Sequence, residues 1–197
     1  LFGVNAVHFW NLCRGIDPRK VVPDRVAKSI SNETTFPTDI HERDILTARL
    51  IQLAWQVGRR LRRHQLAGKT VQLKIRFSDF RTISRSTTLE EPARSNQQII
   101  DSAIRMIEKE LLPRHEPVRL IGVGMNRLSN QAEHQRLLFD QDQQDRQQQL
   151  DSVTDDIAGK FGLRAIQSAR VLQNLPQRND INRTTPGPED PTDLPPP

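Results

Sequence analysis

Apolar and polar residues alternate most regularly in the segment VQLKIRF, residues 71–77. One parity holds Val71, Leu73, Ile75 and Phe77, and the other holds Gln72, Lys74 and Arg76. Successive side chains of a β-strand point to opposite faces of its sheet. The pattern therefore predicts a strand with one buried face and one polar, cationic face.

Three more segments are typical of strands. Residues 27–36 are rich in β-branched and hydroxyl side chains, and residues 81–87 follow 71–77 after a short connection at 78–80. Residues 118–128 place Ile121, Val123 and Met125 on one parity. Each segment has one side suited to a core.

Two segments have helical periodicity. The first follows Asp39, a candidate N-cap, and its apolar stripe contains Leu46, Leu50, Leu53, Ala54, Val57 and Leu61. The second follows Ser95, another candidate cap, and ends at Pro113. Its inward residues are Ile100, Ala103, Ile104, Ile107 and Leu111.

The element order predicts an α+β domain, a four-stranded β-α-β-β-α-β sheet with both helices on one face. The other sheet face is then bare. Its expected side chains are Lys74, Arg76, Thr82, Ser84 and Ser86, with Lys28 and Arg85 flanking them. Cations and hydroxyl groups suit a surface that binds phosphates.

Gly122 and Gly124 share one parity of the last predicted strand. Glycine inside a strand often marks the close approach of a ligand or another backbone, or a bulge. A phosphate reaching the main-chain N–H groups and a local bulge are both compatible with the sequence.

The chain ends differ from this body in composition. Residues 1–15 are typical of a helix that Gly15 stops, and residues 16–27 of an extended linker. We expect a mostly flexible tail: a Gln-rich linker over 129–149, a helical segment over 150–174 with a stripe through Leu150, Val153, Ile157 and Phe161, and disorder over 175–197.

Charge supports a polyanion partner. Residues 1–128 contain 22 Lys/Arg and 13 Asp/Glu and are therefore basic. Residues 129–197 contain 7 Lys/Arg and 11 Asp/Glu and are therefore acidic, a pattern typical of a polyanion binder with a separate arm. Cys13 is the single cysteine, so a disulfide framework is excluded. No apolar run is long enough to span a membrane. We expect a monomeric protein of the reducing cytoplasm.

The motifs RGID, AKSISNETTF and LKIRFSDFRTISRS occur in this order. Together they resemble the C-terminal half of bacterial DNA polymerase IV-like polymerases, the Y-family enzymes of lesion bypass in DNA repair and damage tolerance. The resemblance implies the end of a thumb at 1–15, a tether at 16–27 and a little finger domain at 28–128. In that family the little finger lies across the duplex of template and primer.

The resemblance also implies DNA contacts, which extend the set expected from the bare face. The complete set is Lys28, Ser29, Ser31, Lys74, Arg76, Arg81, Thr82, Ser84, Arg85, Ser86 and Arg119. Family members often carry extra cations near the positions of Leu120 and Gly124, so we expect a weaker grip from the last strand.

No catalytic residue or metal site is expected in this chain. Polymerases hold two metal ions with clustered carboxylates. Asp155 and Asp156 are neighbours on a predicted helix and diverge, and the histidines lack ligand spacing. The chain begins without methionine, so we expect the start of a longer protein to be missing, and the resemblance implies that a palm and fingers precede Leu1. Mg²⁺ is implied only for that full-length polymerase.

The tail sequence HQRLLFD is similar to the peptides with which bacterial replication proteins dock on the sliding clamp. Gln135, Leu138 and Phe139 are the matching residues. The same apolar residues can instead fold back onto the little finger.

The predicted features are also compatible with two other functions. RNA-recognition modules stack bases on aromatic residues of a bare sheet, but here the outward positions are polar. A stand-alone nucleic-acid-binding or clamp-adaptor module without catalysis is the other alternative.

Overall fold

The computed structural model describes residues 3–22, 27–93, 95–111, 116–130 and 141–175. Its elements, in chain order, are the 3₁₀ turn Gly3–Asn5, α1 Ala6–Cys13, β1 Ser29–Ile40, α2 Arg43–Arg63, β2 Leu66–Phe77, β3 Thr82–Ala93, α3 Asn96–Leu111, β4 Val118–Asn130, α4 Gln141–Phe161 and α5 Ala169–Asn174.

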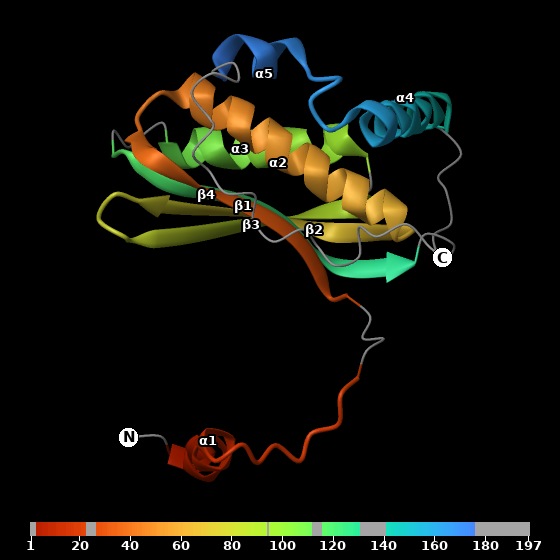
Figure 1. Ribbon diagram of the computed structural model, residues 1–197. Coiled ribbons are helices and arrows are strands. Elements are labelled where there is room, and N and C mark those ends of the chain that lie inside the picture. The colour runs from red at the N-terminus through yellow and green to blue at the C-terminus, as the bar shows by residue number, and fades with distance from the viewer. Residues whose placement is uncertain (1–2, 23–26, 94, 112–115, 131–140, 176–197) are drawn as a thin grey trace.

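The four strands form one antiparallel sheet in the order β1-β4-β2-β3. Strands β4 and β2 are central, and β1 and β3 are the edges. Helices α2 and α3 cover one face of the sheet (Figure 1). The predicted α+β fold with both helices on one side is confirmed.

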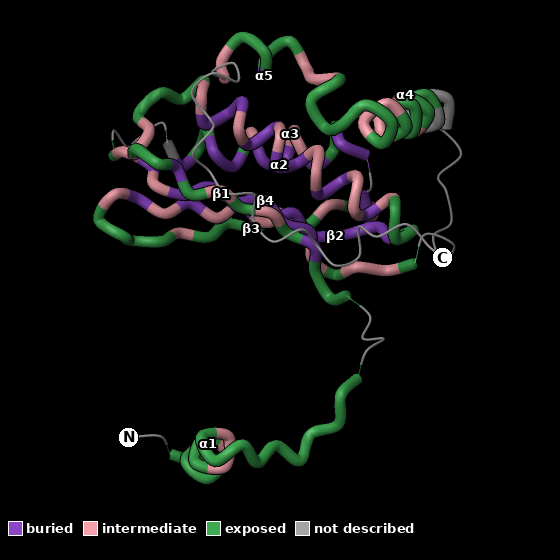
Figure 2. The backbone as a smooth tube through the Cα atoms, viewed as in Figure 1, coloured by how far each residue is buried: buried purple, intermediate pink, exposed green. Residues whose placement is uncertain are grey.

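The core lies between the sheet and these two helices (Figure 2). The predicted apolar parity of β2 is at most 1% exposed, and so are Leu50, Val57 and Leu61 of α2. Burying one such side chain contributes roughly 1.5–3 kcal/mol. This face of the sheet is thereby fixed to the helices, and the opposite parity is turned away from them.

One predicted helix cap is confirmed and one is wrong. Ser95 Oγ accepts a hydrogen bond of 3.3 Å from the N–H of Gln98 at the start of α3. Asp39 does not cap α2, because β1 continues through Pro37 to Ile40 and α2 begins only at Arg43. Proline is tolerated on an edge strand, because a residue on the free edge can lack an N–H group without breaking a hydrogen bond between strands.

The two strand glycines allow β1 to approach β4 closely. A Cβ atom built on Gly122 would lie 2.8 Å from Cβ of Glu33, and one on Gly124 would lie 2.9 Å from Cβ of Ser31. The register is continuous from Ser29 to Thr35. A bulge at these glycines is therefore excluded, and the close neighbour in the structure is the β1 strand.

The N-terminal segment stands apart from the sheet (Figure 1). Gly15 has a φ of +73° and ends α1, as predicted. Val7 and Trp10 are 69% and 59% exposed, so α1 presents apolar side chains to solvent.

The tail differs from expectation in one respect. Helix α4 begins at Gln141, inside the segment predicted to be a flexible linker. In the apolar stripe of this helix, Leu150, Val153 and Phe161 are 55%, 57% and 74% exposed, and Ile157 is half-buried. Residues 176–197, predicted to be disordered, lie outside the described residues.

The inward side of α4 is acidic. Asp151, only 4% exposed, accepts hydrogen bonds of 3.0 Å from both the backbone N–H and the side-chain amide of Asn96. Arg62 of α2 donates to Asp155 over 2.7 and 2.8 Å and to Asp151 over 3.4 Å. We call these four residues the tail clasp, because they join α4 to α2 and to the start of α3.

Candidate nucleic-acid interface

The sheet face opposite the helices is the candidate site, and we call it the open face. The strand register arranges its residues in four rows, each read from β1 to β3. The rows are Ser29, Asn126, Thr70, Thr88; Ser31, Gly124, Gln72, Ser86; Glu33, Gly122, Lys74, Ser84; and Thr35, Leu120, Arg76, Thr82.

Hydroxyl groups dominate the open face. All four positions on β3 are serine or threonine, and so are three of the four on β1. Hydroxyl groups both donate and accept hydrogen bonds, so they bind phosphate oxygens without adding charge. Most of these side chains lie on the edge strands and are exposed.

The two cations of the open face project from central strand β2 and have neighbours on both sides. Lys74 Nζ lies 2.8 Å from Oε2 of Glu33 on β1, two strands away. Arg76 Nε donates to Oγ1 of Thr82 over 2.9 Å. Glu33 is the one acid in the four rows, so it competes with any phosphate for Lys74.

Two further arginines lie near the β2–β3 hairpin: Arg81 directly precedes β3, and Arg119 of β4 lies against Phe80 of the hairpin loop. The N–H of Phe80 donates to the carbonyl of Phe77 over 3.0 Å, and Phe80 has a φ of +66°, the geometry of a three-residue hairpin loop. Phe80 is 64% exposed, and the Arg119 guanidinium lies 4.8 Å from its ring centroid. Arg119 also lies 3.6 Å from Asp39.

Arg81, the other arginine, is bound to acids on both sides. It pairs with Glu116 and, over 3.5 Å, with Asp79. The hydrogen bond to Glu116, followed by the charges of both acids, raises the pKa of Arg81 above its ordinary value. Any DNA contact by Arg81 therefore competes with these exposed ion pairs.

The structure brings most of the predicted DNA contacts together. Ser29, Ser31, Lys74, Arg76, Thr82, Ser84 and Ser86 all share the open face. Lys28 is exposed directly before β1. Whether these residues bind DNA stays a prediction.

Arg85 is the exception, and the expectation that it flanks the open face is wrong. Its cross-strand partner is the buried Leu73, so it lies on the helix side of β3. There its guanidinium makes two hydrogen bonds, of 2.7 and 3.0 Å, with Glu110 of α3. A DNA contact by Arg85 stays a prediction but would come from the other side of this edge strand.

The sequence reasoning missed Glu33 as part of the site. The signal was present, because Ser29, Ser31 and Glu33 occupy one parity of the first strand. It was overlooked because the expected surface was built from the second and third strands, where the outward positions contain no acid.

Three further predictions concern the clamp-binding peptide, metal ions and the membrane. Gln135, Leu138 and Phe139, the predicted clamp-binding residues, lie outside the described residues. Within the described ranges, no group of three His, Cys, Asp or Glu residues could hold a metal ion. The same ranges contain no helix long and apolar enough to cross a membrane.

Comparison with known proteins defines the class. Residues 27–138 match the profile described as "impB/mucB/samB family C-terminal domain". This span is more than half of the chain and contains the whole sheet with α2 and α3. The chain belongs to this family.

Individual relatives within this family are DNA polymerase IV proteins. The chain is 38% identical over 132 residues to DNA polymerase IV 2 of Agrobacterium fabrum, covering 67% of this chain and 37% of the relative. It is 35% identical over 171 residues to DNA polymerase IV of Dehalococcoides mccartyi, covering 87% of this chain and 43% of that relative. The resemblance to DNA polymerase IV inferred from the sequence is thus confirmed, and the chain spans less than half the length of these relatives.

A solved structure described as "Complex of beta-clamp processivity factor and little finger domain of PolIV" is also similar. It has 24% sequence identity and a TM-score of 0.43, and the match covers 56% of this chain and 98% of that chain.

Proposed function

We propose that the open face holds the sugar–phosphate backbone of duplex DNA as part of a lesion-bypass polymerase of the DNA polymerase IV type. The observation that carries this proposal is a sheet face that none of the described helices covers, on which hydroxyl groups surround Lys74 and Arg76. Membership in a family whose relatives are DNA polymerases supports it independently.

The chemistry of the open face suits contacts that do not depend on base sequence. Phosphate contacts fix the position of a protein on DNA, whereas base edges carry the sequence information. Serine, threonine, lysine and arginine side chains match phosphate oxygens at any position along a duplex. A polymerase must move over every sequence, so such a surface fits its task.

The test is the salt dependence of duplex binding. We expect the 197-residue chain to bind primer–template duplexes of unrelated sequence with similar affinity. Each neutralised phosphate adds about 0.9 to the slope of log affinity against log salt. With Lys74, Arg76, Arg81 and Arg119 engaged, the slope is about −3.6. Fluorescence anisotropy at several salt concentrations measures it, and salt-independent binding would refute the proposal.

Recognition of single-stranded RNA is less well supported. Such modules stack bases on aromatic residues in the sheet, and the four rows of the open face contain none. Phe80 lies at the hairpin, where Arg119 already covers its ring. Tighter binding to single-stranded RNA than to duplex DNA would favour this alternative.

We further propose that Gln135, Leu138 and Phe139 form a peptide that docks on a sliding clamp. The support is the sequence itself, in which a glutamine precedes two apolar residues between β4 and α4. Replacing Leu138 and Phe139 with alanine should abolish recovery of the chain by an immobilised clamp. The matched control replaces the exposed Leu163 and Leu172, which also removes apolar area. Equal recovery of wild type and of the Leu138→Ala/Phe139→Ala variant would contradict clamp docking through this peptide.

Catalysis, damaged-DNA binding and a role in DNA repair are proposals for the whole polymerase. Nucleotide transfer and its Mg²⁺ ions would come from a palm domain, and the described residues here would only hold the template–primer duplex. A stand-alone nucleic-acid-binding or clamp-adaptor module remains the alternative, and it predicts that this chain acts without polymerase activity.

A further inference from the structure

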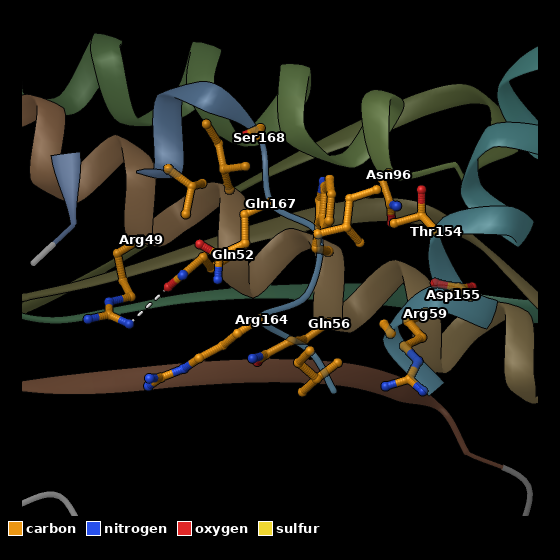
Figure 3. Close-up of a pocket in the computed structure, with 16 residues that line it drawn as sticks. Arg49, Gln52, Gln56, Arg59, Asn96, Thr154, Asp155, Arg164, Gln167 and Ser168 are labelled. Carbon is orange, nitrogen blue, oxygen red and sulfur yellow. Dashed lines mark hydrogen bonds between the residues drawn. The ribbon is translucent and has the colours of Figure 1, made fainter. Parts of the chain in front are cut away.

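A cavity lies between α2 and the tail, on the side of the molecule opposite the open face. It has a volume of about 210 Å³. Helix α2 forms its floor, and α4, the segment after Phe161 and α5 form its walls (Figure 3). Neither the DNA contacts nor the clamp peptide uses this cavity.

Two buried polar atoms at the cavity have no hydrogen-bond partner among the described residues. These are Nε of Arg49 and Oγ of Ser168. The Arg49 guanidinium donates from Nη1 to Oε1 of Gln52 over 2.9 Å (Figure 3). Leaving a buried donor unpaired is costly, about 1–3 kcal/mol for each group. The unpaired Nε of Arg49 therefore indicates a missing acceptor.

The charge at the cavity is positive. Arg49, Arg59 and Arg164 line it, and Asp155 is the one acid among its lining residues. Both oxygens of Asp155 already accept hydrogen bonds from Arg62. Burial and, after it, the charge of Arg164 lower the pKa of Arg49, as expected where two guanidinium groups face each other without an anion.

We propose that this cavity binds a small oxyanion, a molecule with a phosphate or carboxylate group, through Arg49 and Arg164. Arginine offers planar pairs of N–H donors that match both groups. Figure 3 shows Arg49 and Arg164 at the same end of the cavity, with Ser168 on the other side. A bound oxyanion would supply an acceptor for Nε of Arg49 and neutralise the facing guanidinium groups.

The cavity also has apolar walls that could contact the part of a ligand beyond its anionic group. Trp55 of α2 lines it, together with Leu163 and Ile166 of the tail. The volume exceeds the roughly 30 Å³ that one water molecule occupies in the liquid. The site therefore fits an anionic group attached to a small apolar or aromatic body.

Trp55 provides the signal for a direct test. The chain contains two tryptophans, so the variant Trp10→Phe leaves Trp55 as the sole tryptophan. We expect its emission to change saturably when sodium phosphate is added, with sodium chloride at matched ionic strength producing no such change. Sodium succinate serves as the carboxylate probe. Saturation by either oxyanion supports the site and identifies the preferred group, and saturation by neither refutes it.

Variants separate the cavity from general ion binding. In the Trp10→Phe background, Arg49→Gln and Arg164→Gln should each weaken binding about tenfold, the effect of one lost charged hydrogen bond. Arg105→Gln removes an exposed arginine of α3 and should change nothing. An unchanged dissociation constant in both Arg49→Gln and Arg164→Gln would show that the anion binds elsewhere, and circular dichroism verifies that each variant is folded.

The result does not depend on the proposed DNA function. The cavity and the open face lie on opposite sides of the sheet and share no residue. Failure of anion binding would leave the salt-dependent duplex affinity unchanged, and failure of duplex binding would leave the Trp55 titration unchanged.

Discussion

The double variant Lys74→Ala/Arg76→Ala should weaken duplex binding by about tenfold or more at low salt, because it removes both cations of the open face. The loss should be the same for unrelated DNA sequences, since these side chains would contact phosphates. The salt slope should flatten by about 1.8, or 0.9 for each lost phosphate contact. Anisotropy titrations of wild type and variant measure both quantities.

The matched control is Arg105→Ala/Lys109→Ala. It removes the same charge from exposed positions on α3, on the covered side of the sheet. If long-range charge alone governed binding, the two double variants would behave alike. Such equality would argue against a phosphate-binding open face.

Glu33→Gln tests the same surface, but here we expect duplex binding to become tighter rather than weaker. It removes the acid that pairs with Lys74 over 2.8 Å and so frees that ammonium group for a phosphate. Affinity for duplex DNA should rise and the salt slope should steepen. Glu108→Gln, an exposed position on α3 with the same charge change, is the control.

Asp151→Ala should release the tail from the body of the domain. Asp151 is 4% exposed and holds both the backbone N–H of Asn96 and part of the Arg62 charge. Breaking a buried ion pair costs about 3–5 kcal/mol when the structure stays closed. Here α4 can detach and let Arg62 and Asn96 regain water, so the loss is limited to the free energy of tail docking.

Hydrogen exchange measures this release. In Asp151→Ala the amides of α4 and the Asn96 N–H should exchange faster, while the core strands β2 and β4 keep their protection. Asp156→Ala removes the same charge from an exposed neighbouring position and should leave the exchange of α4 unchanged. If α4 stayed equally protected in Asp151→Ala, other contacts would hold the tail.

Local patterns in the sequence predicted the body of the fold well. Strand alternation placed Val71 to Phe77 and Ile121 to Met125 on the correct sides, because a period of two ties each side chain to one face. Helical periodicity placed Leu50, Val57 and Leu61 in the core for the same kind of reason. Seven of the eleven predicted DNA contacts therefore share the open face.

The errors arose where distant residues decide the structure. Arg62 and Asp155 are 93 positions apart, and their pairing turns α4 so that its acids face inward. Local periodicity places Leu150 and Val153 on one stripe of a helix, but it contains no signal of the remote arginine that decides which side faces inward. The pairing of Arg85 with Glu110 of α3 is a similar case, because it depends on where another element packs.

The tail clasp lies on the helix side of the sheet, whereas the open face looks the other way. The docking of α4 therefore leaves the open face uncovered, and a duplex bound there, as proposed, would not have to displace the tail. Opening of the tail clasp would in turn leave the strand register of the open face intact.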